Sequence, residues 1–197
     1  MKILSAEFLK SAADLEGCPD SHAAEFAFIG RSNVGKSSLL NMLTNKKGLA
    51  KVSSTPGATQ LVNFFEINRK WYMVDLPGYG YSKTPQKIRE GFQVMVTDYL
   101  TQREQLRCVF VLLDSRHSPQ KIDLAFCEWL GNSGIPFVLI FTKTDKSKAG
   151  KVNANVEAFL KSLAELLDGE PRVFRTSAEK GTGRGEVLDF IDQALKV

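Results

Sequence analysis

The sequence predicts one α/β domain in which a mostly parallel β-sheet is covered by helices on both faces. Three observations predict this fold. Segments with strand-like and helix-like hydrophobic patterns alternate along almost the whole chain, which is typical of a parallel sheet with helical crossovers. The segments 108–114 and 136–143 each contain an unbroken apolar run, as expected for strands buried on both faces. A glycine-containing turn at 30–35 joins a buried segment directly to a helical pattern.

The elements expected from these patterns follow in chain order. Six segments read as strands: 25–30, 61–67, 71–78, 108–114, 136–143 and 172–177. The second and third of them form a hairpin. Five segments read as helices: 36–44, 88–100, 118–130, 152–167 and 187–195. In the third helix, Ser118 is the expected N-cap and Pro119 the first helical residue.

Residues 1 to about 24 are polar and read as irregular. We therefore expect an N-terminal extension over 1–24, packed on or flanking a core domain over 25–197. The chain of 197 residues suits one domain with a full core, and we expect a monomer.

Composition and charge exclude several classes of protein. The chain is 43% hydrophobic and 24% charged, which is ordinary globular usage, and no apolar run is long enough to span a membrane. Charged residues at 7, 10 and 14 interrupt the N-terminal segment, so it lacks a signal-peptide core and we expect a cytoplasmic protein. The cysteines at 18, 108 and 127 are odd in number and widely spaced, which indicates free thiols. The net charge of +4 permits a nucleic-acid partner without requiring one.

Residues 30–37 match G-x-x-x-x-G-K-[ST], the pattern of a phosphate-binding P-loop. Glycines let the backbone curl so that several N–H groups face one anion, and the following helix N-terminus adds partial positive charge. Lys36 would bring a full charge to the β- and γ-phosphates, and Ser37 a hydroxyl to Mg²⁺. The residues predicted to hold a nucleoside triphosphate here are Gly30, Arg31, Ser32, Asn33, Val34, Gly35, Lys36, Ser37 and Ser38.

A second motif separates guanine from adenine nucleotides. Thr142, Lys143, Thr144 and Asp145 follow a buried strand and resemble the [NT]-K-x-D guanine motif of Ras-like GTPases. The Asp145 carboxylate can accept hydrogen bonds from N1–H and the 2-amino group of guanine, which adenine lacks. Each such bond is worth roughly 1.5–3 kcal/mol, so two would favour guanine by about 10² to 10⁴.

Thr176, Ser177 and Ala178 fall where such proteins place the last loop that contacts the base. The backbone N–H groups of Ser177 and Ala178 would face the guanine oxygen. In isolation the same segment reads as a plain turn at a strand end.

Two further loops are expected to surround the phosphates. Asp75, Leu76, Pro77 and Gly78 fit D-x-x-G, with Asp75 holding Mg²⁺ through water and the Gly78 N–H contacting the γ-phosphate. The long loop 45–60 contributes Gly57, Ala58, Thr59 and Gln60. The Thr59 hydroxyl is the candidate for a second metal contact, with Thr55 and Ser54 as competing choices. The predicted metal ligands are thus Ser37, Thr59 and Asp75, and the predicted catalytic residues are Lys36, Thr59 and Gly78.

Tyr79 occupies the position where Ras-type proteins place a water-orienting glutamine. An aromatic ring cannot orient water in that way, so we expect slow intrinsic hydrolysis that a partner or K⁺ stimulates. Asn33 gives the P-loop an asparagine at a position where it resembles the P-loop of GTPases that use bound K⁺ in place of an arginine finger. The alternative is that Asn33 only supports the turn.

The motifs FIGRSNVGKSSLLNML, TPGATQLVNFF, VDLPGYGYSK, LLDSRHSP and FTKTDK together resemble the EngB (YsxC or YihA) family of bacterial GTPases. The resemblance runs from about residue 6 to the C-terminus. It implies a three-layer Ras-like P-loop GTPase domain with a six-stranded sheet containing one antiparallel strand. It also implies Mg²⁺-dependent GTP binding and a role in assembling the large ribosomal subunit from rRNA and ribosomal proteins. A link to normal cell division and septation is implied as well.

Two positions bear on this resemblance. Ala58 departs from it, because family members often carry Arg or Lys there. Asp114, Arg116 and Pro119 match the family's D-x-R-x-x-P pattern. We interpret that pattern as a strand end followed by helix capping.

Three functions compete at this point. The first is a GTP-hydrolysing assembly factor, whose basic residues around the switch loops would face RNA. Those residues are Lys46, Lys47, Lys51, Arg69, Lys70, Lys83 and Lys87. The second is a GTP-responsive adaptor in cell division that hydrolyses too slowly to matter and has no ribosomal role. The third, a P-loop ATPase or nucleotide kinase, is disfavoured by Asp145.

Overall fold

The computed structural model describes residues 1–50, 61–79 and 86–196, with backbone only for 86–93. Its strands are β1 (Ala6–Ala12), β2 (Ala24–Gly30), β3 (Val62–Ile67), β4 (Trp71–Asp75), β5 (Leu106–Asp114), β6 (Phe137–Thr142) and β7 (Val173–Arg175). Its helices are α1 (Lys36–Thr44), α2 (Gln86–Gln102), α3 (Lys121–Asn132), α4 (Ala149–Ala164) and α5 (Arg184–Ala194). A short 3-10 helix covers Thr144–Lys146.

The strands of the described residues form one seven-stranded sheet in the order β1-β3-β4-β2-β5-β6-β7. β3 pairs antiparallel with both of its neighbours, and the other pairings are parallel. The predicted mostly parallel sheet with one antiparallel strand is therefore confirmed, and so is the hairpin of β3 and β4. Asn68 and Arg69 in its turn both have positive φ, at 52° and 55°, the backbone that tight hairpin turns require.

The strand count differs from the prediction because β1 was expected to be irregular. β1 pairs with β3 at the sheet edge, with a register shift between Phe8 and Lys10. Along the strand only Ala6 and Ala12 are buried, at its two ends. An edge strand with a bulge loses the two-residue alternation on which strand prediction depends, so the sequence pattern concealed it.

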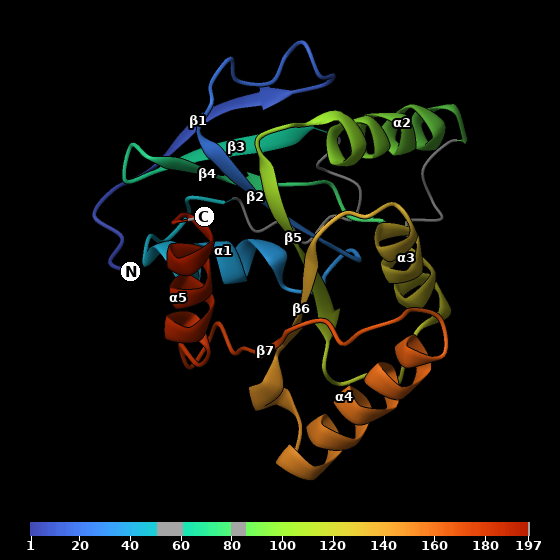
Figure 1. The fold of residues 1–197 in the computed structure, drawn as a ribbon. Coiled ribbons are helices and arrows are strands. Elements are labelled where there is room, and N and C mark those ends of the chain that lie inside the picture. The colour runs from blue at the N-terminus through green and yellow to red at the C-terminus, as the bar shows by residue number, and fades with distance from the viewer. Residues whose placement is uncertain (51–60, 80–85, 197) are drawn as a thin grey trace.

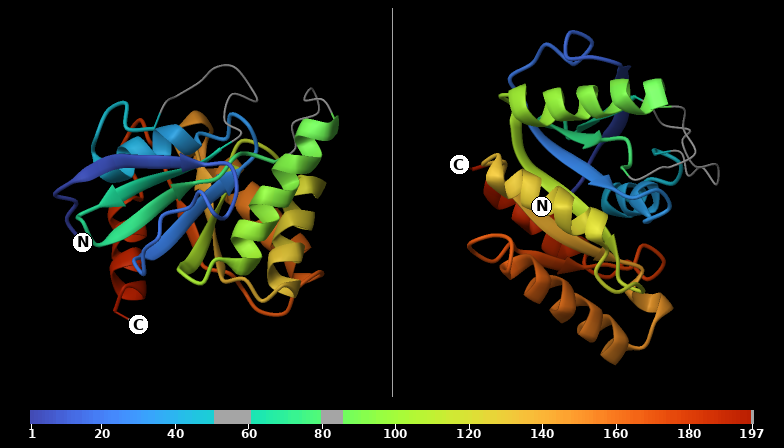
Figure 2. Two further views of the ribbon diagram at one scale, coloured as in Figure 1. Left: turned by 90° about the horizontal axis from the view of Figure 1, so that it is seen from above. Right: turned by 90° about the vertical axis from the view of Figure 1, so that its right-hand side faces the viewer.

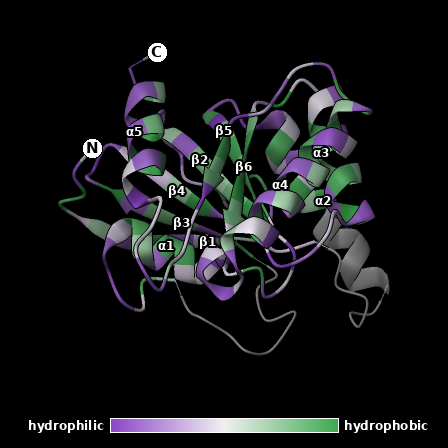
Figure 3. Ribbon diagram, turned by 90° about the horizontal axis from the view of Figure 1, so that it is seen from below, coloured by the Kyte–Doolittle hydropathy of each residue, from purple (hydrophilic) through white to green (hydrophobic). Residues whose placement is uncertain are grey.

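Helices cover both faces of the sheet, as Figures 1 and 2 show. α1 and α5 pack on one face, and α2, α3 and α4 pack on the other. β5 supplies both cores: Val109, Val111 and Leu113 face α2–α4, whereas Phe110 and Leu112 face α1 and α5. Figure 3 shows the resulting pattern, with hydrophobic residues along the central strands and hydrophilic residues on the outer helix surfaces. The three-layer α/β prediction is confirmed. Of the described helices, none combines the length and apolarity needed to cross a membrane.

The start of α3 corrects one prediction. Gln120 has extended backbone (φ −103°, ψ 131°), and its carbonyl accepts the N–H groups of Asp123 and Leu124. The first helical turn therefore closes on Gln120. Ser118 is not the N-cap and Pro119 is not the first helical residue, so the capping interpretation of the D-x-R-x-x-P pattern is wrong.

A buried ion pair joins three segments at the end of the sheet away from the P-loop. Glu25, at the start of β2, is 0% exposed. Its carboxylate accepts hydrogen bonds from Arg103 Nη2 at 2.7 Å and from the Tyr99 hydroxyl at 2.7 Å. Arg103 Nη2 also donates to the Pro19 carbonyl at 2.6 Å. We call this cluster the Glu25 clasp. It fastens the end of α2 and the N-terminal segment to β2.

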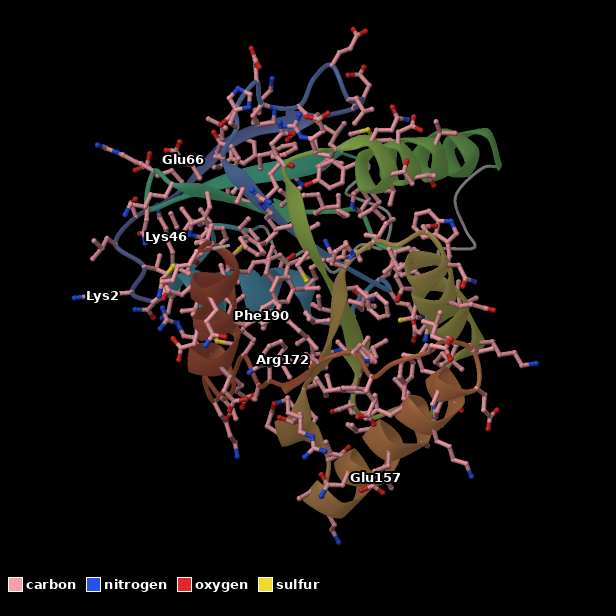
Figure 4. The ribbon with its side chains drawn as sticks, in the orientation of Figure 1. Lys2, Lys46, Glu66, Glu157, Arg172 and Phe190 are labelled. Atoms are coloured by element: carbon pink, nitrogen blue, oxygen red, sulfur yellow. The ribbon has the colours of Figure 1, made fainter. Side chains whose placement is uncertain are left out.

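Cation–π contacts of the Arg172 guanidinium with one aromatic ring of β7 and one of α5 link these two elements. The Arg172 guanidinium lies 5.4 Å from the Phe174 ring and 5.6 Å from the Phe190 ring, and Figure 4 shows Arg172 beside Phe190. Because β7 leads directly into residues 176–178, this packing fixes the start of that loop.

Candidate active site

The described motifs meet at one edge of the sheet. β2 ends at Gly30, β4 at Asp75, β6 at Thr142 and β7 at Arg175, and each predicted motif begins where its strand ends. Since these strands are parallel, their carboxyl ends share an edge. The predicted positions Gly57, Ala58, Thr59 and Gln60, with Ser54 and Thr55, lie outside the described residues.

The P-loop needs glycine at both ends for different reasons. A Cβ added at Gly30 would lie 2.7 Å from the Leu112 carbonyl oxygen, so the loop passes too close to β5 for a side chain. Gly35 has φ of 102° and forms the N-cap of α1. Asn33 also has positive φ, at 63°, and is exposed. The turn thus opens the N-terminus of α1 toward solvent.

The D-L-P-G segment packs directly on the P-loop. A Cβ at Gly78 would lie 2.7 Å from the Gly30 carbonyl oxygen and 3.3 Å from the Ser32 nitrogen. Asp75 is buried, and its carboxylate pairs with the Lys36 ammonium. The two charged residues predicted to handle phosphate and metal therefore face each other across the loop.

The T-K-T-D segment is tied to the P-loop by two side chains. The Thr142 hydroxyl lies 2.6 Å from the Val34 carbonyl oxygen. The Lys143 ammonium donates to the Asn33 carbonyl oxygen at 2.6 Å and to the Asp114 carboxylate at 2.9 Å. Two loops that are 108 and 110 residues apart in sequence are thereby held at a fixed spacing.

Asp145 is held in place from the next loop. Its Oδ1 accepts a 2.6 Å hydrogen bond from the Ser177 hydroxyl, and its Oδ2 lies 3.3 Å from the Lys146 ammonium. The hydrogen bond from Ser177 lowers the pKa of Asp145 below its ordinary value, and Lys146 contributes in the same direction. The carboxylate is therefore an anion at neutral pH with a fixed orientation.

A pocket of about 950 Å³ lies between α1 and these two loops. Ser38, Lys143, Asp145, Ala178 and Arg184 are among its lining residues. Its volume suits a nucleotide-sized ligand, and its wall carries several cationic side chains and two carboxylates, those of Asp145 and Glu179.

The Tyr79 backbone pairs with Arg31 of the P-loop, and its side chain packs against α3. Its hydroxyl donates to Asp123 Oδ1 at 2.9 Å, and its ring stacks on Phe126 with centroids 4.6 Å apart. Burial raises the pKa of Tyr79 well above its ordinary value, and the Asp123 charge adds to the shift. The side chain is a neutral packing group in this position, and its hydroxyl already has a partner.

Sequence reasoning missed two contributions to this site. Ser177 was predicted for its backbone N–H, but that group donates to the Thr182 carbonyl at 3.2 Å and the side chain supports Asp145 instead. Asp114 was assigned to a strand end, but its carboxylate contacts Lys143. The matching D-x-R pattern was the available signal. Its partner lies 29 residues further along the chain, so spacing alone could not identify the contact.

The chain matches a protein-family model and is similar to individual known proteins. A protein-family model described as 50S ribosome-binding GTPase matches residues 25–143. The probable GTP-binding protein EngB of Bacteroides fragilis (strain YCH46) is 53% identical over 196 residues, which cover 100% of this chain and 98% of that protein. The probable GTP-binding protein EngB of Phocaeicola vulgatus is 55% identical over 192 residues, covering 98% and 96%.

Two solved structures share the fold. A crystal structure of a probable GTP-binding protein engB aligns with a TM-score of 0.66 at 23% identity, covering 88% of this chain and 99% of that one. The crystal structure of Era in complex with MgGDPNP and nucleotides 1506–1542 of 16S ribosomal RNA aligns with a TM-score of 0.67 at 22% identity, covering 88% and 56%.

The fold and the family match define a P-loop GTPase, an enzyme that binds GTP and hydrolyses it to GDP. Its identity of more than 50% to relatives over nearly its whole length defines a narrower group: the chain belongs to the EngB family of GTP-binding proteins.

Proposed function

We propose that residues 30–38 and 75–78 bind the phosphates of GTP. The observation that supports this most directly is the contact of Gly78 with the P-loop backbone, because it places the D-L-P-G segment beside the N-terminus of α1. Lys36, which pairs with Asp75 here, would exchange that partner for the β- and γ-phosphates. The Gly78 N–H would contact the γ-phosphate.

Mg²⁺ fits the donor groups present. Ser37 and Asp75 offer a hydroxyl and a carboxylate, the oxygen ligands that this cation prefers, and Asp75 already faces the P-loop through Lys36. When bound, the cation neutralises charge that builds up on the phosphates. Thr59 stays the proposed second metal contact, and Gly57, Ala58 and Gln60 the proposed neighbours of the nucleotide.

The guanine base is assigned to the pocket beside Asp145. Its carboxylate would accept from N1–H and the 2-amino group, while residues 142–144 hold it at the edge of the P-loop. Of the N–H groups predicted to face the guanine oxygen, the one on Ser177 is engaged with Thr182. The Ala178 N–H is therefore the proposed donor.

The proposed cellular role is a GTP-driven switch in assembly of the large ribosomal subunit, with an associated need in cell division and septation. It is supported by the matched family model, whose description names 50S ribosome binding, and by Era, which was crystallised with ribosomal RNA. Such a role would place the protein in the cytoplasm as a monomer that visits its particle. The competing proposal is a slow GTP-responsive adaptor in cell division without a ribosomal partner.

The proposed set of RNA-facing basic residues needs one correction. Arg69 and Lys70 lie in the β3–β4 turn, at the opposite end of β4 from Asp75, so they are not beside the phosphate loops. Lys46 and Lys47 do line the pocket, together with Lys146, Lys180 and Arg184. Lys51, Lys83 and Lys87 fall where the structure describes no side chain.

Sedimentation with purified large subunits tests the ribosomal role. We expect the protein to co-sediment with them in at least one nucleotide state, and its GTP turnover to rise in their presence. A surface that contacts about four phosphates should lose roughly 100-fold in affinity between 50 and 200 mM salt. Binding that is indifferent to salt would remove the electrostatic part of the proposal. If the protein neither binds large subunits nor hydrolyses GTP faster in their presence, the ribosomal role fails and the competing proposal of an adaptor in cell division stands.

The hydrolysis rate supplies a separate prediction. Because the Tyr79 hydroxyl is bonded to Asp123, no side chain at this position orients water, and single-turnover hydrolysis by the protein alone in NaCl should be slow. An arginine finger supplies roughly 10³- to 10⁵-fold, so a K⁺ ion at Asn33 that replaces part of it should raise the rate at least about tenfold. The measurement exchanges KCl for NaCl at constant ionic strength. Equal rates in both salts would leave Asn33 as a turn residue only.

A further inference from the structure

The Lys143 ammonium links the base loop to the P-loop and depends on a third element. It reaches the Asn33 carbonyl at 2.6 Å and Asp114 Oδ2, at the end of β5, at 2.9 Å. Its stem also lies along the P-loop, since a Cβ at Gly35 would be 3.5 Å from Lys143 Cε. The carbonyl is a neutral acceptor, so the Asp114 carboxylate is the charged partner that fixes this ammonium.

Arg116 in turn fixes the Asp114 carboxylate. Arg116 Nε donates to Oδ1 at 2.8 Å, Nη2 donates to Oδ2 at 2.7 Å, and the Arg116 backbone N–H donates to Oδ1 at 3.1 Å. This two-point contact leaves the carboxylate one orientation, in which Oδ2 faces Lys143. Burial alone would raise the pKa of Asp114, but the hydrogen bonds from Arg116 and Lys143 lower it to about 2. The carboxylate is charged throughout the physiological range.

We propose that Asp114 and Arg116 are positioning residues for the guanine nucleotide. Arg116 orients Asp114, Asp114 holds Lys143, and Lys143 holds the P-loop at a fixed distance from the loop that carries Asp145. The phosphate and base halves of the site are then arranged before the nucleotide arrives, which lowers the ordering cost of binding. This inference rests on the proposed role of residues 142–145 in binding the base.

Asp114→Asn keeps the size of the side chain and removes its charge. We expect GDP to dissociate about tenfold faster or more, the size of one hydrogen bond to a charged group. Arg116→Ala should also speed the dissociation of GDP, and Arg116→Lys should speed it by a smaller factor. The matched control is Asp168→Asn, the same charge change at an exposed aspartate beyond the end of α4, where dissociation should stay at the wild-type rate.

A double-mutant cycle separates positioning from general destabilisation. If Asp114 acts through Lys143, Asp114→Asn combined with Lys143→Met should release GDP no faster than Lys143→Met alone. Additive effects would overturn the proposal. Melting temperatures without nucleotide identify variants that are unfolded. If Asp114→Asn is unfolded, the GDP dissociation rates of Arg116→Lys and Arg116→Ala test the proposal instead. The Arg116 side chain is 40% exposed, so we expect these variants to fold.

Asp145→Asn distinguishes this inference from the function on which it rests. If that variant loses guanine preference while the Asp114 and Arg116 variants release GDP at the wild-type rate, the inference fails and the base assignment stands. If Asp145→Asn keeps its preference, the base assignment itself fails.

Discussion

Asp145→Asn should lose most of the preference for guanine over adenine nucleotides. The carboxylate can accept two hydrogen bonds from guanine, each worth roughly 1.5–3 kcal/mol, so the preference should fall by about 10² to 10⁴. The effect is expected to be large because Ser177 and Lys146 hold the carboxylate of Asp145 in one orientation on the pocket wall. An amide in its place offers one acceptor and one donor, and the donor opposes the 2-amino group of guanine.

Equilibrium competition measures this effect. A fluorescent GDP analogue with Mg²⁺ is displaced by GDP, GTP, ATP and xanthosine diphosphate, in wild type and variant. Xanthine carries a carbonyl where guanine carries its 2-amino group, so the variant should bind the xanthine nucleotide better than GDP. That gain excludes unfolding as the reason for the lost GDP affinity. If ATP competes as well as GTP in wild type, Asp145 does not recognise guanine in this protein.

Ser177→Ala is the matched milder variant. It removes the 2.6 Å hydrogen bond that orients Asp145 but keeps the carboxylate. Guanine preference should therefore weaken by about tenfold, the value of one hydrogen bond to a charged group, and the xanthine nucleotide should gain nothing. An effect as large as that of Asp145→Asn would mean that Ser177 contacts the base itself.

The sequence alone was enough to predict those parts of the fold that show a clear local hydrophobic pattern. β5 and β6 are apolar on both faces and α1 follows its glycine turn, so their existence and order could be predicted from composition and period. β1 could not, because an exposed edge strand with a bulge has no alternation to detect. Its place is set by pairing with β3, which lies 50 residues away in sequence at the nearest pair.

The candidate site divides in the same way. Motif spacing assigned segments to phosphate, metal and base binding, and the described motifs do follow the ends of their strands, at one edge of the sheet. It could not show how the motifs support one another. The contacts of Ser177 with Asp145 and of Asp114 with Lys143 join residues 32 and 29 positions apart, at or just beyond the ends of neighbouring strands. Such pairs are determined by the order of the strands in the sheet, which cannot be read from a single sequence.

Arg103→Ala should cost the protein about 3–5 kcal/mol of its free energy of unfolding. The substitution leaves the Glu25 carboxylate, 0% exposed, with the Tyr99 hydroxyl as the remaining donor of the Glu25 clasp. An uncompensated buried charge is penalised by about that amount, which is a large share of the roughly 5–15 kcal/mol that stabilises a typical domain. Urea unfolding should show a lower midpoint with an unchanged m-value.

Two comparisons make this prediction specific. Arg107→Ala, at an exposed arginine near the start of β5, should change stability by less than about 0.5 kcal/mol. Combining Arg103→Ala with Glu25→Gln should recover part of the loss, because a buried amide costs less than a buried charge. If the double variant is less stable than Arg103→Ala alone, the unpaired charge is not the cause.

The loss should not extend to nucleotide binding. Glu25 is the second residue of β2 and the P-loop begins at its last residue, Gly30, so five residue steps of strand, about 17 Å, separate the clasp from the P-loop. Below the melting temperature of Arg103→Ala, its affinity for GDP should match wild type within about twofold, since nothing that touches the site has changed. A large loss of affinity in the folded variant would mean that the end of α2 transmits its position to the segment 75–79. The clasp would then take part in the switch as well as in the stability of the fold.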